Sequence, residues 1–138
     1  MILIVCVDEK NGMLFNNRRQ SKDRNLIEHI LKKIDSKKLW ITEFSRDLFL
    51  IKPCNNIIID NNLVEKIEKD DYCFIENIDI NTIIDKVDKI IVYNWNRHYP
   101  ADTYLDVSLC NWIKESETNI LGFSHDKITE IIYVKEKN

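Results

Sequence analysis

The sequence predicts a single α/β domain built on a mainly parallel β-sheet. The apolar runs at residues 2–7 and 89–95 are typical of strands that are buried on both faces. Between them, short β-prone segments alternate with segments of helical periodicity, which is the order of a parallel sheet with helices on both faces. A length of 138 residues suits one domain with one core, so we assign residues 1–138 to a single domain.

The first third of the chain predicts a strand, a turn, a polar loop and a helix. Residues 2–7 form the strand, and Gly12 is the residue expected to take a positive φ angle in the turn that follows. Ser21 is expected to cap the helix, in which apolar residues recur at helical spacing as far as Ile34. Asp23 is expected in the first turn of this helix, where a negative charge complements the helix dipole.

The rest of the chain predicts short elements with little glycine or proline between them. We expect strands at residues 38–42, 56–60, 72–75, 89–95 and 127–134, and short helices or helical turns at residues 45–49, 63–68 and 81–87.

Charge and composition argue against several classes of partner. The net charge is -3, and its 20 basic and 23 acidic residues are interspersed, so no basic stripe is available for nucleic acid. The apolar N-terminal run is one strand long and lacks the features of a signal peptide, and no segment approaches a membrane span. The four cysteines have no CxxC spacing and indicate reduced thiols in a cytoplasmic protein.

Two segments, within residues 2–18 and 88–112, together resemble one enzyme family, dihydrofolate reductase. Residues 2–12, continuing through Asn16-Asn17-Arg18, are similar to that family's first strand and the loop that closes over its active site. Residues 88–93, the stretch 99–104 (Tyr-Pro-Ala-Asp-Thr-Tyr) and Trp112 are similar to a later strand, its "GDT" turn and a tryptophan beyond it. The resemblance implies a mixed, mainly parallel sheet flanked by helices, with antiparallel C-terminal strands.

The middle of the chain departs from the family's pattern. Gln20-Ser21 stands where the family has Pro-Trp, and the stretch Thr42-Glu43-Phe44-Ser45 replaces the segment that holds the cofactor phosphates. Glu76-Asn77 replaces a Gly-Gly turn that the dinucleotide approaches closely. The family's substrate-binding arginine is absent from residues 53–56. These differences argue against ordinary NADPH-dependent reduction of dihydrofolate.

The resemblance nevertheless implies a set of site residues. Asp23 is the nearest candidate for the family's catalytic carboxylate, with Tyr93 as its neighbour on the fifth strand; alternatively, Asp23 only complements the helix N-terminus. The polar loop at residues 15–21 is the first choice for a segment that faces a ligand. The predicted ligand-binding residues are Val5, Asn16, Arg18, Arg19, Gln20, Trp40 and Thr42, the predicted cofactor-binding residues are Ser45 and Asp102, and no metal site is predicted.

Ser124-His125-Asp126 contains the residue types of a catalytic triad. Adjacent side chains cannot converge as base and orienter, so this segment is interpreted as a loop or the start of a strand. His125 could still contact a ligand if that turn lies near the pocket.

Three functions are compatible with these observations. The preferred one is a small-molecule-binding or regulatory domain for a small planar ligand, without ordinary dihydrofolate reductase activity and without a cofactor. The second is a diverged NAD(P)H-dependent reductase, which would use NADPH. The third is a protein-interaction module; under any of the three, the protein would be a monomer or a homodimer.

Overall fold

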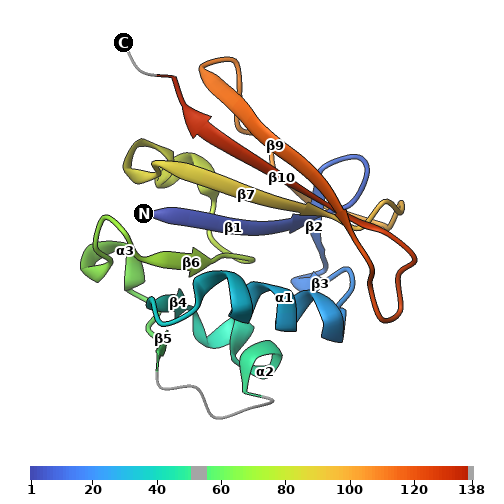
Figure 1. Ribbon diagram of the computed structural model, residues 1–138, viewed down its shortest axis with the longest axis horizontal. Coiled ribbons are helices and arrows are strands. Elements are labelled where there is room, and N and C mark those ends of the chain that lie inside the picture. Colours follow the sequence, from blue (N-terminus) through green and yellow to red (C-terminus); the bar gives the residue numbers. More distant parts are fainter. Residues whose placement is uncertain (51–55, 137–138) are drawn as a thin grey trace.

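The computed structural model describes residues 1–50 and 56–136 and contains one large sheet (Figure 1). Within these residues the sheet has seven strands in the order β5-β4-β6-β1-β7-β10-β9. The first five in this order are parallel, whereas β10 is antiparallel to β7 and β9 is antiparallel to β10. The strands are β1 (Ile2–Val7), β4 (Leu39–Ile41), β5 (Ile57–Ile59), β6 (Tyr72–Phe74), β7 (Lys89–Asn94), β9 (Trp112–Ile120) and β10 (Ile128–Lys135).

A smaller antiparallel sheet and several short helices complete the described part of the chain. The small sheet has the order β3-β2-β8. Its strands are β2 (Gly12–Phe15), β3 (Arg18–Arg19) and β8 (Thr103–Tyr104). The α-helices are α1 (Arg24–Ile34), α2 (Arg46–Phe49) and α3 (Leu63–Lys66), and the 3-10 helices are η1 (Glu43–Ser45), η2 (Ile80–Thr82) and η3 (Ile84–Lys86).

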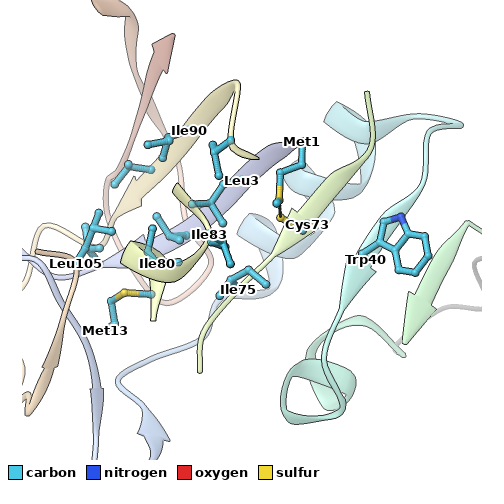
Figure 2. Close-up of a cluster of buried hydrophobic side chains, with 14 of the residues drawn as sticks. Met1, Leu3, Met13, Trp40, Cys73, Ile75, Ile80, Ile83, Ile90 and Leu105 are labelled. Carbon is cyan, nitrogen blue, oxygen red and sulfur yellow. Dashed lines mark hydrogen bonds between the residues drawn. The ribbon is translucent and has the colours of Figure 1, made fainter. Parts of the chain in front are cut away.

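The large sheet is covered on both faces because its central strands are apolar at successive positions. On one face, Leu3 and Val5 of β1 belong to a cluster with Leu63 of α3 and Ile80 of η2, part of which Figure 2 shows. On the other face, Ile4 belongs to a second cluster, to which α1 and α2 contribute. The prediction of helices on both faces is therefore confirmed.

Two details of the first third of the chain differ from expectation. Asn11, not Gly12, takes the positive φ angle, of 64°. Gly12 is instead closely packed, because a Cβ there would lie 2.7 Å from Ala101 Cβ and 2.9 Å from Asp8 Oδ2. The helix cap is Asp23, whose side chain accepts hydrogen bonds from Asn25 N and Leu26 N. Ser21 lies two residues earlier and is left available for another contact.

Some strands carry no sequence signal strong enough to predict them. The strands β2, β3 and β8 are two to four residues long, and β9 alternates little because most of its side chains are exposed. Backbone pairing with β10 holds β9 in place, and backbone pairing is independent of side-chain hydrophobicity. The helix expected at residues 81–87 is instead the pair of 3-10 turns η2 and η3.

None of the helices within residues 1–50 and 56–136 is both long enough and apolar enough to cross a membrane.

Candidate functional site

The candidate site lies beyond the carboxyl ends of β1 and β6, where α1 and α2 approach the small sheet (Figure 1). Clefts at this edge are the usual ligand sites of open α/β sheets. A cavity of about 20 Å³ is present there, large enough for about one water molecule. Its walls combine apolar side chains, such as Ile27, Leu48 and Phe74, with polar residues of the segment 19–23. We call this space the central cavity.

Arg19 closes one side of the central cavity. Its Nε donates to Glu76 Oε1 at 2.9 Å and its Nη2 to Glu76 Oε2 at 3.0 Å, while Nη1 donates to Asp47 Oδ2 at 2.7 Å. Ser45 Oγ donates to the same Glu76 carboxylate at 2.6 Å, and both side chains are buried. Burial opposes the charge on the guanidinium, but the carboxylates of Glu76 and Asp47 outweigh it and raise the pKa of Arg19.

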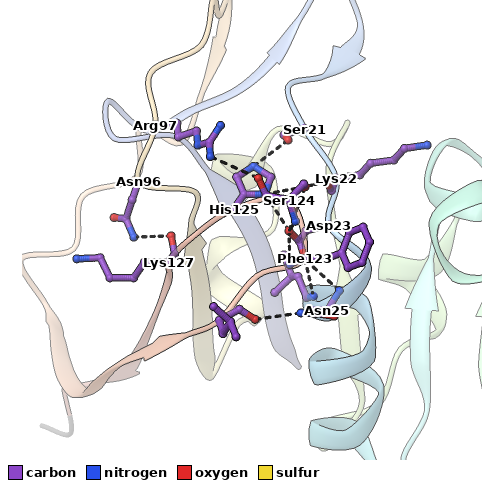
Figure 3. Close-up of polar contacts among 12 residues, drawn as sticks. Ser21, Lys22, Asp23, Asn25, Asn96, Arg97, Phe123, Ser124, His125 and Lys127 are labelled. Atoms are coloured by element: carbon purple, nitrogen blue, oxygen red, sulfur yellow. Dashed lines mark hydrogen bonds and ion pairs between the residues drawn. The ribbon is translucent and has the colours of Figure 1, made fainter.

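A second polar network joins the start of α1 to the turn before β10 (Figure 3). Asp23 Oδ2 lies 2.9 Å from His125 Nδ1, and His125 Nε2 lies 3.0 Å from Ser21 Oγ. The backbone N–H groups of Phe123 and Ser124 donate to the Asp23 carboxylate at 2.9 Å. Burial of Asp23 would raise its pKa, yet these bonds and the bond to His125 hold that pKa well below its ordinary value.

Two aromatic residues hold the His125 ring in position. Trp95 stacks on the ring with a centroid distance of 4.6 Å and an interplanar angle of 28°. Tyr99 places its hydroxyl 3.2 Å from His125 Nε2, the nitrogen that also faces Ser21. The imidazole is 3% exposed, so its hydrogen-bond partners and the Trp95 face define its orientation.

The loop that precedes this network is fixed by Asp8, at the end of β1. Its Oδ2 accepts hydrogen bonds from Gln20 Nε2 at 3.0 Å and from Tyr99 N at 3.1 Å, and its Oδ1 accepts from Gly12 N at 2.8 Å. Burial opposes the charge on Asp8, but these donors lower its pKa. Gln20 Oε1 is buried and has no hydrogen-bond partner among the described residues.

The predicted catalytic residues Asp23 and Tyr93 belong to different networks. Tyr93 OH donates to Glu130 Oε2 at 2.8 Å, and His29 Nε2 lies 2.7 Å from the same oxygen. Burial and the Glu130 carboxylate raise the pKa of the Tyr93 phenol. Asp23 caps α1, as the dipole interpretation expects, and also binds His125. Their catalytic roles stay predictions.

The other predicted residues fall into two groups. Arg19 and Gln20 line the central cavity, and Ser45 reaches its rim through Glu76. The remaining ones do not line the central cavity. Val5 and Trp40 belong to the core on the face of the large sheet opposite α1. Thr42 Oγ1 donates to Asn77, Asp102 accepts a hydrogen bond from Asn16 N, and the Arg18 side chain is exposed. Their proposed binding roles also stay predictions.

Sequence reasoning does not identify three residues of this site, namely Glu76, Trp95 and Tyr99. Ser21 lies in the polar loop that is predicted to face a ligand, although its own predicted role is a helix cap, and Glu76 stands out only as a departure from a family pattern. His125 was noted as a ligand contact, but its pairing with Asp23, which is 102 positions away in the chain, has no local signal. The segment 53–55, where a substrate-binding arginine is missing, and Cys54 lie outside the described residues.

Three open grooves surround the central cavity. The α1–α2 groove, of about 320 Å³, is lined by Lys22, Asp23, Arg24, Ile27, Asp47, Leu48, Phe123 and Ser124. The hairpin groove, of about 500 Å³, is lined by Phe15, Asn16, Arg18, Arg19, Gln20, Tyr99 and Pro100. The acidic groove, of about 370 Å³, includes the carboxylates of Glu76, Asp79, Asp102 and Asp106.

Thiol and metal chemistry have little support at this site. Burial and the nearby Glu76 carboxylate raise the pKa of the Cys6 thiol, which lines the central cavity and therefore stays protonated. Cys6, Cys73 and Cys110 are free thiols. Among the residues that the structure describes, no group of three or more His, Cys, Asp or Glu side chains is placed to hold a metal ion.

Comparison with known proteins identifies the fold. No protein-family model and no curated protein matches the sequence. Among solved structures, dihydrofolate reductase from Enterococcus faecalis, in complex with NADP(H) and RAB-propyl, superposes with a TM-score of 0.69. The match covers 99% of this chain and 96% of that chain at 11% sequence identity. The chain has a dihydrofolate-reductase-like fold.

The dihydrofolate-reductase-like fold confirms the predicted class of architecture. The mainly parallel sheet, the flanking helices and the antiparallel strands β9 and β10 are those that the two resembling segments imply. At 11% identity the likeness concerns the fold alone, so function is argued from the site.

Proposed function

We propose that this protein is a small-molecule-binding domain that has kept a reductase-like scaffold without NADPH-dependent reduction of dihydrofolate. The observation that carries the proposal is the Arg19–Glu76–Ser45 network. Ser45 lies in the stretch where the family resemblance expects cofactor phosphates, and Glu76 lies in the turn where it expects a close approach of the backbone to the dinucleotide. Both places are therefore occupied by side chains that bond to each other or to Arg19. A ligand would therefore bind beside this network.

The residues present do not fit NADPH. The acidic groove presents Glu76, Asp79, Asp102 and Asp106 to any ligand that follows the end of β6. A dinucleotide carries negatively charged phosphates, which need N–H groups or cations rather than carboxylates. Arg19, whose guanidinium contacts Glu76, already has two carboxylate partners.

The α1–α2 groove offers the better surface for a small planar ligand. Its volume of about 320 Å³ reaches the lower end of the range for small-molecule sites. Phe123 is 64% exposed, and the guanidinium carbon of Arg24 lies 4.3 Å from its ring centroid. Lys22 is also exposed at the same rim, so a planar ligand with an anionic group would find both an aromatic face and two cations.

Ligand screening by thermal shift tests the proposal. The panel contains pterins, mononucleotides and dinucleotides, each at millimolar concentration, and we expect stabilisation by at least one planar anionic compound. Phe123→Ala should abolish that shift. The matched control is Leu121→Ala, which removes a 75% exposed apolar side chain from the same loop and should leave the shift unchanged.

Fluorescence titration with NADPH separates the alternatives. We expect no saturable binding at millimolar NADPH. Saturable NADPH binding would contradict the proposal and favour the diverged reductase. No stabilisation by any compound, together with a dimeric mass in solution, would instead favour the protein-interaction module.

A further inference from the structure

We infer that Ser21, His125 and Asp23 form a nucleophile–base–orienter triad for the transfer of acyl groups. Ser21 is the nucleophile, His125 the general base and Asp23 the residue that orients the imidazole. The three side chains come from two segments, the loop before α1 and the turn before β10, which lie together in Figure 3.

The distances match this assignment of roles. His125 Nε2 lies 3.0 Å from Ser21 Oγ, and His125 Nδ1 lies 2.9 Å from Asp23 Oδ2. Both separations fall in the range that a nucleophile–base pair and a base–orienter pair require. Unrelated folds place such triads in different chain orders, so the order Ser21, Asp23, His125 is no obstacle.

The carboxylate determines which nitrogen of His125 carries the proton. Asp23 accepts hydrogen bonds from the N–H groups of Phe123 and Ser124 and is ionised, so it offers only acceptors to the imidazole. Neutral His125 then carries its proton on Nδ1, and the lone pair of Nε2 faces the Ser21 hydroxyl. This tautomer is the one that can remove a proton from Ser21.

The three residues differ in exposure as the chemistry requires. The Asp23 side chain is 0% exposed and that of His125 is 3% exposed, which protects the base and its orienter from water. Ser21 is half-buried and lines the central cavity. Its two neighbours in the sequence line different grooves, Gln20 the hairpin groove and Lys22 the α1–α2 groove.

The reaction would proceed in two balanced steps. Ser21 Oγ bonds to the carbonyl carbon of an ester while its proton passes to His125 Nε2; the bond to the leaving alcohol breaks, and the alcohol takes that proton. Water then attacks the acyl-serine, gives a proton to Nε2, and releases the acid as Ser21 regains its proton.

The dimensions of the site indicate how a substrate would reach Ser21. The central cavity, of about 20 Å³, holds about one water molecule and leaves no room for an acyl group. The ester would therefore approach half-buried Ser21 from its solvent-exposed side. The Tyr99 hydroxyl lies 3.2 Å from His125 Nε2, so Tyr99 and Ser21 both contact the nitrogen that acts as the base.

Two measurements on the intact protein test the triad. Diisopropyl fluorophosphate should add to Ser21 with loss of fluoride, seen as one adduct by intact mass and located by peptide mapping. Hydrolysis of p-nitrophenyl acetate should fall at least ~100-fold in Ser21→Ala and His125→Gln. The control is Ser36→Ala, which changes an exposed serine in the turn after α1 and should keep the wild-type rate.

The labelling result does not depend on the stability of any variant, because it uses the folded wild-type protein. An adduct on another residue, or no adduct with excess reagent, would overturn the triad, as would equal rates for wild type and Ser21→Ala. Failure of the triad would leave the small-molecule-binding proposal intact, since that is measured by reversible thermal shifts in the α1–α2 groove.

Discussion

The guanidinium of Arg19 and the carboxylate of Glu76 are joined by two hydrogen bonds, of 2.9 and 3.0 Å. Arg19 belongs to β3 of the small sheet, whereas Glu76 follows β6 of the large sheet. The pair therefore connects the hairpin of the small sheet to the carboxyl-terminal end of the parallel strands of the large sheet, at the wall of the central cavity. Paired buried charges of this kind are sensitive to the loss of one partner.

Replacing Glu76 by glutamine should destabilise the protein. Glu76→Gln keeps the size of the side chain but removes the charge that Arg19 and Ser45 Oγ both contact. We expect a loss of about 1–3 kcal/mol in the free energy of unfolding, measured by urea denaturation, because Arg19 is left with Asp47 as its only carboxylate partner among the described residues.

A surface pair provides the control for Glu76. Glu43 and Arg46 form an exposed ion pair at 3.2 Å, and such pairs contribute about 0–1 kcal/mol. Glu43→Gln should therefore change the free energy of unfolding much less than Glu76→Gln. Equal losses in the two variants would show that the Arg19–Glu76 contact contributes no more to the free energy of unfolding than an exposed ion pair.

Removing the hydroxyl of Tyr93 should reduce stability without affecting ligand binding in the α1–α2 groove. The phenol is fully buried and donates to the Glu130 carboxylate at 2.8 Å. We expect Tyr93→Phe to cost about 1–3 kcal/mol, because a buried carboxylate loses a donor. Tyr104→Phe, at a 50% exposed position, is the matched control and should be near neutral. A loss of ligand binding in Tyr93→Phe would instead support a direct role of this residue in the site.

Stability should depend on pH through Glu130. Burial would raise the pKa of Glu130, but hydrogen bonds from His29 and Tyr93 and the charge of Lys33 lower it to about 2 from an ordinary value of 4.5. A carboxylate whose pKa is lowered on folding stabilises the protein fully above its unfolded value. This contribution, of about 1–3 kcal/mol, should be lost as the pH falls from about 4.5 toward about 2.

Urea denaturation of wild type and Glu130→Gln between pH 2 and pH 6 measures this contribution. Asp8 and Asp23 also have lowered pKa values and destabilise the protein in acid, so the informative quantity is the difference between variants. Wild type should lose more stability than Glu130→Gln over the range. Glu117→Gln, which changes an exposed residue of β9, should behave as wild type, and parallel curves for all three proteins would contradict the assignment.

The elements of the core were predictable because burial leaves a periodic signal. The runs that form β1 and β7 are apolar at successive positions, which is typical of a strand covered on both faces. The strand β9 shows no such signal, because its Lys, Glu and Ser side chains face solvent and its place depends on pairing with β10. The family resemblance implies antiparallel C-terminal strands and therefore adds information that periodicity does not contain.

The site was predictable only in part. Arg19 and Gln20 are predictable because they lie in a polar stretch between a strand and a helix, where functional loops commonly lie. Asp23 is predictable only through the family resemblance. Ser21 was misassigned because serine and aspartate compete for the same cap, and the aspartate accepts both N–H bonds here. The partnership of Asp23 with His125 follows from strand order and register, which no local pattern of residues encodes.

Gly122 should be intolerant of even a methyl group because the Asp23–His125 contact lies directly against it. A Cβ at this position would clash with the backbone carbonyl oxygen of His125 and lie 2.8 Å from Asp23 Oδ2. The backbone and a buried carboxylate cannot move aside easily, so Gly122→Ala should lower the free energy of unfolding by about 1–3 kcal/mol and displace the turn that carries His125.

Urea denaturation measures this loss of stability in Gly122→Ala, and labelling of Ser21 by diisopropyl fluorophosphate should slow in parallel if the triad is functional. Leu121→Ala, next to it in sequence and 75% exposed, should change stability by less than about 0.5 kcal/mol. Wild-type stability in Gly122→Ala would mean that the turn and the carboxylate are not packed as closely as described.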